Sequence, residues 1–269
     1  MEQIKQAIKK AKAERDVSPP QRKPKAVANN TAEPGIPLPM PANCKLKRTY
    51  LETTRIVAFD GEAPGTAAYD MLRTRIMQKM RFSGWHTLGI TSPRQGCGKT
   101  VTAINLAFSL ARQPDQTIIL ADIDFRKPNV SRYLGFDAER DVHSVLNGDC
   151  QLTSAFSRPD LGGPGLRILA NSNPVMDPSV IVHSQRMKKL MKSMKDAAGS
   201  GFVIVDLPPV LAADDVIALL PQLDCVLMVV AAGETTPAEI EECDRLLSAA
   251  NSVDIVLNKS DEADHSYYY

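Results

Sequence analysis

Residues 90–100, ITSPRQGCGKT, combine the residue types that bind a phosphate group. Gly96 and Gly98 allow the backbone to bring its N–H groups close to phosphate oxygens, and the N-terminus of the helix expected next attracts negative charge. Lys99 would then reach the β- and γ-phosphates of a nucleotide, and the Thr100 hydroxyl would bind Mg²⁺. The stretch therefore predicts a phosphate-binding loop.

The setting of this loop supports the prediction. A short apolar run, residues 87–90, precedes it, and an apolar-periodic run, residues 101–110, follows it, which gives the order strand, glycine loop, helix. The loop is a variant, because Pro93 stands where the full pattern has its first glycine. An ordinary glycine-rich turn is the alternative. The predicted nucleotide contacts in this region are Gly96, Cys97, Gly98, Lys99, Thr100 and Val101.

Three aspartates follow predicted buried strands. Asp122 and Asp124 come after the apolar run 117–121, and Asp206 comes directly after the run 202–205. Because Mg²⁺ prefers one or two carboxylates plus waters, Asp206 fits a metal-orienting role. One of the first two aspartates can serve the metal while the other accepts a proton from a hydroxyl, and the sequence does not decide which. The predicted metal ligands are Thr100, Asp122 and Asp206, and the predicted catalytic residues are Lys99, Asp122 and Asp124.

Strands and helices alternate along the chain. Apolar runs predict strands at 88–90, 117–121, 166–169, 202–205, 225–230 and 253–257. Helical spacing predicts helices at 69–80, 101–110, 142–146, 179–198, 214–220 and 237–250. This order predicts an α/β fold, a doubly wound, mainly parallel sheet with helices on both faces. The glycine loop, the three aspartates and Asn258 then meet at the carboxyl edge of the sheet, where such folds bind ligands.

The first fifty residues differ in composition from the rest. Residues 1–50 hold eleven Lys/Arg against four Asp/Glu, a net charge of +7 in a chain of net charge +1. Residues 18–41 contain seven prolines and few large apolar side chains, so they predict a linker without a core. We expect a largely disordered basic arm at 1–50, a folded domain at 51–260 that begins between residues 50 and 67, and a flexible acidic tail at 261–269.

Cysteine spacing, hydropathy and charge indicate the expected location and partners of the protein. The five cysteines are far apart without a C-x-x-C spacing, which favours a reducing cytosol without disulfides or zinc. No run approaches eighteen apolar residues, so neither a membrane span nor a secretory signal is predicted. The expected location is cytoplasmic. The basic arm could contact the inner face of the membrane, whereas the folded part has no charge that favours nucleic acid.

Three motifs together resemble the Walker A, Walker A′ and Walker B motifs of bacterial tyrosine kinases that govern capsule and exopolysaccharide synthesis. They lie at residues 92–100, 119–128 and 203–209, and the similarity extends over about residues 69–258. The A′ motif discriminates best, since ordinary P-loop ATPases lack Asp-x-Asp-x-Arg on the second strand. The resemblance implies a P-loop NTPase fold like that of partition ATPases, with ATP and Mg²⁺ bound, and Asn258 near the adenine.

The same resemblance implies a substrate and partners. The family autophosphorylates a C-terminal tyrosine cluster, and this chain ends in Tyr267, Tyr268 and Tyr269 after an acidic stretch. It implies a homo-oligomer that phosphorylates in trans, and a separate membrane adaptor of the polysaccharide chain-length-determinant type. Family members often carry Glu-x-x-Arg-x-x-Arg, tied to ring assembly, before the first strand. Here those positions are Ala67, Asp70 and Arg73, so only the last arginine is kept.

Two other functions compete with the kinase. Partition and septum-site ATPases have a similar sheet and act as nucleotide-driven switches without phosphotransfer, and their signature lysine would fall at Arg94. Residues 258–261 also match the N-K-x-D guanine-recognition motif of GTPases. The A′ arginine, Arg126, with Pro128 two residues after it, and the terminal tyrosines favour the kinase over the ATPase switch. The GTPase match is interpreted as a coincidence, because the kinase family also has an asparagine after this strand, near the adenine.

Overall fold

Eight strands form one sheet in the computed structural model, which describes residues 42–260. The strands are β1 (Ala42–Cys44), β2 (Thr87–Thr91), β3 (Ile118–Asp122), β4 (Ser157–Pro159), β5 (Leu166–Leu169), β6 (Phe202–Asp206), β7 (Cys225–Ala231) and β8 (Val253–Asn258). Their order across the sheet is β1-β4-β5-β3-β6-β2-β7-β8, and only β4 and β5 pair antiparallel. The predicted mainly parallel sheet is confirmed.

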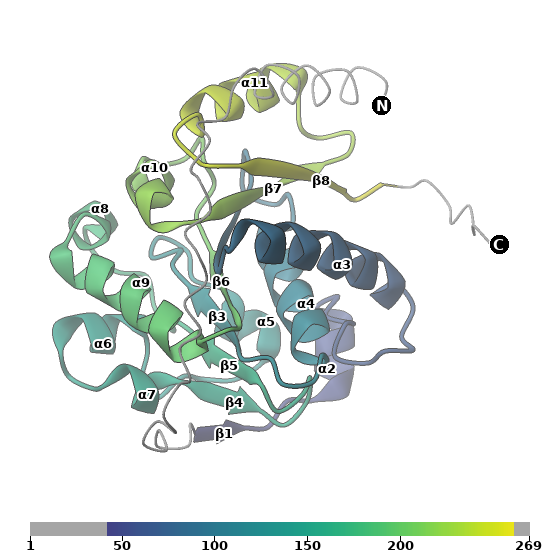
Figure 1. Ribbon diagram of the computed structural model, residues 1–269, viewed down its shortest axis with the longest axis vertical. Coiled ribbons are helices and arrows are strands. Elements are labelled where there is room, and N and C mark those ends of the chain that lie inside the picture. Colours follow the sequence, from purple (N-terminus) through teal and green to yellow (C-terminus); the bar gives the residue numbers. More distant parts are fainter. Residues whose placement is uncertain (1–41, 261–269) are drawn as a thin grey trace.

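Helices cover both faces of this sheet (Figure 1). They are α2 (Arg48–Thr53), α3 (Thr66–Ser83), α4 (Lys99–Ala111), α5 (Val130–Leu134), α6 (Val142–Asn147), α7 (Leu152–Ala155), α8 (Pro178–Val182), α9 (Gln185–Ala198), α10 (Asp215–Leu219) and α11 (Pro237–Leu246), with a 3-10 turn η1 (Leu220–Gln222). Alternate residues of β3 belong to different cores: Ile118 and Leu120 pack with α4, whereas Ile119 and Ala121 pack with α9. Covering on both faces explains why the central strands are apolar runs.

The strand that leads into the glycine loop lies near the middle of the sheet. β2 pairs with β6 on one side and with β7 on the other, and β6 also pairs with β3. In the last of these ladders Asp122 lies directly opposite Asp206. The parallel register therefore brings the ends of these strands together at one edge.

The structure corrects two predicted boundaries of helices. The single helix predicted at 179–198 is two helices, because the chain breaks at His183 and Ser184. The Ser184 hydroxyl accepts a hydrogen bond from the Met187 N–H and caps α9. The helix predicted at 237–250 ends at Leu246, and Thr236 caps its start by forming a capping box with Glu239.

The structured region also begins earlier than predicted. β1 and the first residues of α2 precede residue 51, the predicted start of the domain, and β1 extends the sheet by pairing with β4. The Leu46 N–H donates to Asp160 Oδ1 at 2.9 Å, and Leu51 is fully buried. A three-residue strand beside a proline-rich stretch leaves no periodic pattern, so the sequence did not reveal it. The arm and linker within residues 1–41 and the tail at 261–269 lie outside the described residues. Within 42–260, no helix is long and apolar enough to cross a membrane.

Close packing at the start of β6 leads to a testable prediction. A Cβ atom on Gly201 would lie 1.9 Å from the Thr117 carbonyl oxygen, which accepts a hydrogen bond from the Phe202 N–H. Gly201→Ala should therefore push β3 and β6 apart and lower the free energy of unfolding by about 2–3 kcal/mol, measured by urea denaturation.

The matched control is Gly84→Ala at the end of α3. Gly84 also precedes a strand but has open space around its Cβ position and a φ of 66°. Only backbone strain of about 1 kcal/mol is expected there. Equal losses in the two variants would contradict the packing argument.

Candidate active site

The glycine loop is held by the last strand of the sheet. Gly98 has a φ of 98°, and a Cβ atom there would lie 2.1 Å from Asn258 Nδ2. The same Asn258 amide donates to the Cys97 carbonyl oxygen at 2.9 Å. Asn258, at the end of β8, therefore positions the loop, and only glycine fits at residue 98.

Lys99 lies between two buried carboxylates. Its Nζ atom is 2.8 Å from Asp124 Oδ2 and 3.6 Å from Asp206 Oδ1. Burial lowers the pKa of Lys99, but the charges of Asp206 and Asp124 outweigh this effect and raise the pKa to about 12. The lysine therefore carries its positive charge at neutral pH, at the N-terminus of α4, where a phosphate would bind.

Thr100 and Asp206 form the second part of the cluster. The Thr100 hydroxyl donates to Asp206 Oδ2 at 2.7 Å, whereas the buried Asp206 Oδ1 atom has no hydrogen-bond partner. Burial raises the pKa of Asp206, although Lys99 and the Thr100 hydroxyl oppose the shift. An unsatisfied buried carboxylate oxygen next to a threonine hydroxyl fits the donor set of a hard cation such as Mg²⁺.

Asp122 is turned away from Lys99. Its Oδ2 atom accepts hydrogen bonds from the Asn129 and Val130 N–H groups, each at 2.9 Å, and its Oδ1 atom accepts one from the Asp124 N–H at 3.2 Å. Burial, followed by the charge of Asp206, raises the pKa of Asp122 to about 8. The two aspartates of the A′ motif therefore differ: Asp122 anchors the start of α5, whereas Asp124 faces the lysine.

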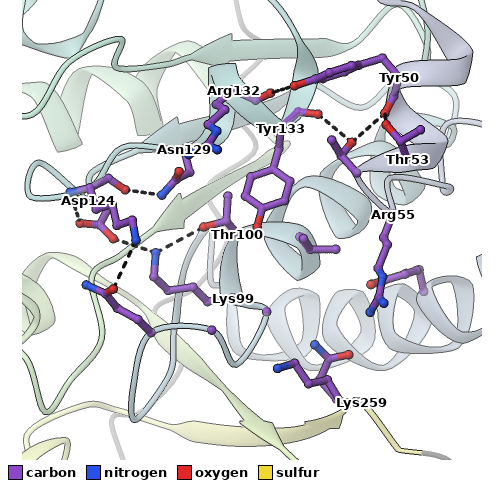
Figure 2. Close-up of a pocket in the computed structure, with 18 residues that line it drawn as sticks. Tyr50, Thr53, Arg55, Lys99, Thr100, Asp124, Asn129, Arg132, Tyr133 and Lys259 are labelled. Carbon is purple, nitrogen blue, oxygen red and sulfur yellow. Dashed lines mark hydrogen bonds and ion pairs between the residues drawn. The ribbon is translucent and has the colours of Figure 1, made fainter.

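A pocket of about 650 Å³ opens over these groups (Figure 2). Of the predicted site residues, it is lined by Gly96, Gly98, Lys99, Thr100, Val101, Asp124 and Asn258. Asp122 and Asp206 lie behind them without exposed surface. Cys97 is buried and lines a neighbouring hollow with Arg94 and Thr235. Tyr267, Tyr268 and Tyr269 lie outside the described residues.

Several lining residues were not predicted from the sequence. They are Tyr50, Thr53, Thr54, Arg55, Tyr69, Gln95, Lys127, Asn129, Arg132, Tyr133 and Lys259. The first four come from α2 and the turn after it, which we had placed at the edge of or outside the folded domain. All three tyrosines among residues 42–260 line this one pocket, but no pattern in the sequence connects them.

The chain is similar in sequence and in fold to known proteins. The AAA domain family matches residues 86–259. EpsB of Ralstonia nicotianae is 31% identical over 208 residues, which are 77% of this chain but 27% of EpsB, so the chain spans about a quarter of that relative. The tyrosine-protein kinase YwqD of Bacillus subtilis is 27% identical over 226 residues, 83% of this chain and 93% of YwqD. The solved kinase domain of the Escherichia coli tyrosine kinase ETK matches at 25% identity with a TM-score of 0.70, covering 80% of this chain and 84% of that domain.

The fold and the glycine loop define a P-loop NTPase of the AAA domain family. Within that class, the chain belongs to the bacterial tyrosine kinase family.

The raised pKa of Asp122 predicts a pH dependence of stability in the nucleotide-free protein. An unfolded aspartate has a pKa near 3.9, whereas folded Asp122 has one of about 8. The folded state therefore binds the extra proton between these values, and the stability that this proton contributes is lost as the pH rises toward 8. Asp122→Asn removes this titration. In EDTA, the melting temperature of wild type should fall relative to Asp122→Asn between pH 5 and pH 8.5.

Gly84→Ala is the control for this experiment, because it changes no titratable group. Its difference from wild type should stay constant over the same pH range. A constant difference for Asp122→Asn as well would show that Asp122 does not carry the shift.

Proposed function

We propose that this protein is an ATP-dependent protein-tyrosine kinase that regulates capsular or exopolysaccharide synthesis and phosphorylates its own terminal tyrosines, Tyr267, Tyr268 and Tyr269. The observation that carries the proposal is the placement of Lys99 between Asp124 and Asp206 at the start of α4. Family membership and the tyrosine cluster at the end of the chain support tyrosine as the residue that is phosphorylated.

Lys99 has a different partner when ATP binds. In the nucleotide-free site its ammonium group pairs with Asp124. The β- and γ-phosphates offer more negative charge at the same position, next to the N–H groups of the glycine loop. We therefore expect Lys99 to exchange Asp124 for the phosphates, which frees the Asp124 carboxylate. Thr100 and Asp206 would hold Mg²⁺, which neutralises phosphate charge.

Phosphotransfer then needs only positioning and one proton acceptor. The tyrosine oxygen bonds to the γ-phosphorus while the bond from that phosphorus to the β–γ bridging oxygen breaks, which leaves ADP and phosphotyrosine. The hydroxyl proton passes to a carboxylate. Asp124 suits this role because it lines the pocket, whereas the Oδ2 atom of Asp122 already accepts two backbone hydrogen bonds.

The partition-type ATPase switch is the alternative, and it depends on Arg94. In this structure Arg94 Nε lies 2.6 Å from Glu239 Oε1, and its NH2 group donates to the Glu234 carbonyl oxygen at 2.5 Å. These contacts hold the side chain within its own chain, against the loop before α11 and its first turn. A residue engaged in this way is a poor candidate to reach a nucleotide in a second copy, and this favours the kinase.

The first test is the intact mass after incubation with Mg-ATP. Wild type should gain mass in steps of one phosphate that map to the terminal tyrosines. Lys99→Met should reduce the rate roughly 100-fold or more, because it removes the charge that stabilises the transferred group. Asp124→Asn should retain Mg-ADP binding but lose phosphotransfer to a similar degree.

Lys192→Met is the matched control, since Lys192 is an exposed lysine of α9 that does not line the pocket. It should phosphorylate like wild type. ATP hydrolysis without any gain in mass would support the switch instead. Full phosphotransfer in Asp124→Asn together with its loss in Asp122→Asn would exchange the roles of the two aspartates.

We also propose partners for the kinase: a membrane adaptor of the chain-length-determinant type and a second copy of the chain that presents its tyrosines. The ring contact of the family is altered here. Asp70 pairs with Arg73 at 2.8 Å and with Arg112, and it accepts a hydrogen bond from the Ser109 hydroxyl. Arg73 is thus engaged within the chain, so the copies would meet through other contacts.

The net charge of +7 on residues 1–50 supports a peripheral contact with an anionic membrane surface. Deletion of residues 1–41 should release the protein from the membrane fraction while leaving its affinity for Mg-ADP unchanged. An unaltered distribution between membrane and soluble fractions would argue against a role of the arm in this contact.

A further inference from the structure

One wall of the nucleotide pocket comes from α2 and the turn after it, at the start of the predicted domain. Tyr50, Thr53, Thr54 and Arg55 line the pocket. The residues between and after them anchor the wall in the core, because the side chains of Leu51, Ile56 and Ala58 are fully buried. The wall is therefore a rigid part of the fold.

A single amide connects this wall to the phosphate-binding helix. Asn105 lies on α4, six residues after Lys99, and is fully buried. Its Oδ1 atom accepts hydrogen bonds from the Val57 and Ala58 N–H groups at 2.8 and 2.9 Å. Its Nδ2 group donates to the Arg55 and Val101 carbonyl oxygens at 3.0 and 2.9 Å. All four hydrogen-bonding positions of the amide are used, so the wall keeps a defined position relative to the phosphate site.

Arg55 has a strained backbone within this wall. Its φ is 62°, a conformation that costs a non-glycine residue free energy and that persists where the surroundings over-determine it. The Asn105 contact to its carbonyl oxygen is part of that constraint. The Arg55 side chain is exposed and has no hydrogen-bond or ion-pair partner within residues 42–260. Such an arginine is available for a ligand.

The position of Arg55 indicates which part of a ligand it would meet. Figure 2 shows Arg55 across the pocket from Asp124, with Lys99 and Thr100 between them. In the proposed function Lys99 meets the β- and γ-phosphates, Thr100 holds Mg²⁺ and Asp124 lies at the transfer end. The nucleoside must then extend toward the opposite side. On that side Lys259 is already paired with Glu234 at 2.7 Å.

We propose that Arg55 is a nucleoside-binding residue whose guanidinium group stacks against the base, and that Asn105 is the positioning residue that holds it there. The proposal rests on the proposed function only in that a nucleotide occupies the pocket. The planar, delocalised guanidinium group suits stacking on an aromatic ring, which the ammonium group of a lysine does not replace. The strained backbone is then the cost of directing this side chain over the pocket.

The test compares two probes by isothermal titration calorimetry. Mg-ADP contains the nucleoside, and Mg-pyrophosphate does not. Arg55→Ala and Arg55→Lys should each weaken Mg-ADP binding about tenfold, while binding of Mg-pyrophosphate stays as in wild type. Arg75→Ala, which removes an exposed arginine of α3 outside the pocket, should leave both affinities unchanged.

A second readout separates ligand binding from structure. Arg55→Gly removes the strain at φ 62°, so the nucleotide-free variant should melt roughly 2 °C higher than wild type and still bind Mg-ADP as weakly as Arg55→Ala. In Asn105→Ala the wall loses its anchor. If Asn105 acts through Arg55, the two substitutions should not add. The Kd of the double variant Arg55→Ala/Asn105→Ala for Mg-ADP should then be no higher than that of the single variant that binds less tightly.

Three results would overturn the proposal. They are a wild-type Kd for Mg-ADP in Arg55→Ala, an equal loss for Mg-ADP and Mg-pyrophosphate, and full retention by Arg55→Lys, which would reduce Arg55 to a source of positive potential. None of these results would bear on the proposed kinase activity, which is tested separately by the tyrosine phosphorylation of wild type and Lys99→Met. If wild type bound no Mg-ADP, both the proposed function and this inference would fail.

Discussion

The site depends on a buried cluster of one ammonium group and three carboxylates. Lys99 faces Asp124 and Asp206, and Asp122 lies behind them, all nearly or fully buried. Three acids around one base leave an excess of negative charge where water is scarce, which is unfavourable unless protons or a cation neutralise it. The raised pKa values of Asp122 and Asp206 express this cost. In the proposed function, a divalent cation held by Thr100 and Asp206 would add positive charge to this cluster, and the phosphates would take the place of Asp124 as the partner of Lys99.

Two asparagines, one buried and one half-buried, fix the position of the backbone around this cluster. Asn258 holds the glycine loop from β8, and Asn105 holds the wall at residues 55–58 from α4. Each amide satisfies backbone groups that secondary structure leaves unpaired, so each is both a structural requirement and a geometric constraint on the pocket. The pocket is thus bounded by three segments far apart in the sequence that are connected through two side chains.

The errors of the sequence prediction have physical causes. The helix expected at 179–198 reads as continuous because apolar residues recur across its break, but Ser184 caps α9 and ends that continuity. The start of the domain was placed too late because β1 is three residues long and α2 six. Such short elements are stabilised by their contacts with β4 and α5 and carry almost no periodic signal of their own.

The sequence by itself determined the class of fold, the phosphate-binding loop and the roles open to Lys99, Thr100 and the three aspartates, because these depend on local spacing and on the rule that parallel strands end at one edge. Only the tertiary structure decided that Asp124 and not Asp122 pairs with Lys99. The sequence left open which of the two aspartates would face the lysine. The tertiary structure also decided that Arg55 and the three tyrosines of the described residues line the pocket. These residues lie on elements whose positions are set by packing against α4 and α5, and contacts between distant segments leave no pattern in a single sequence.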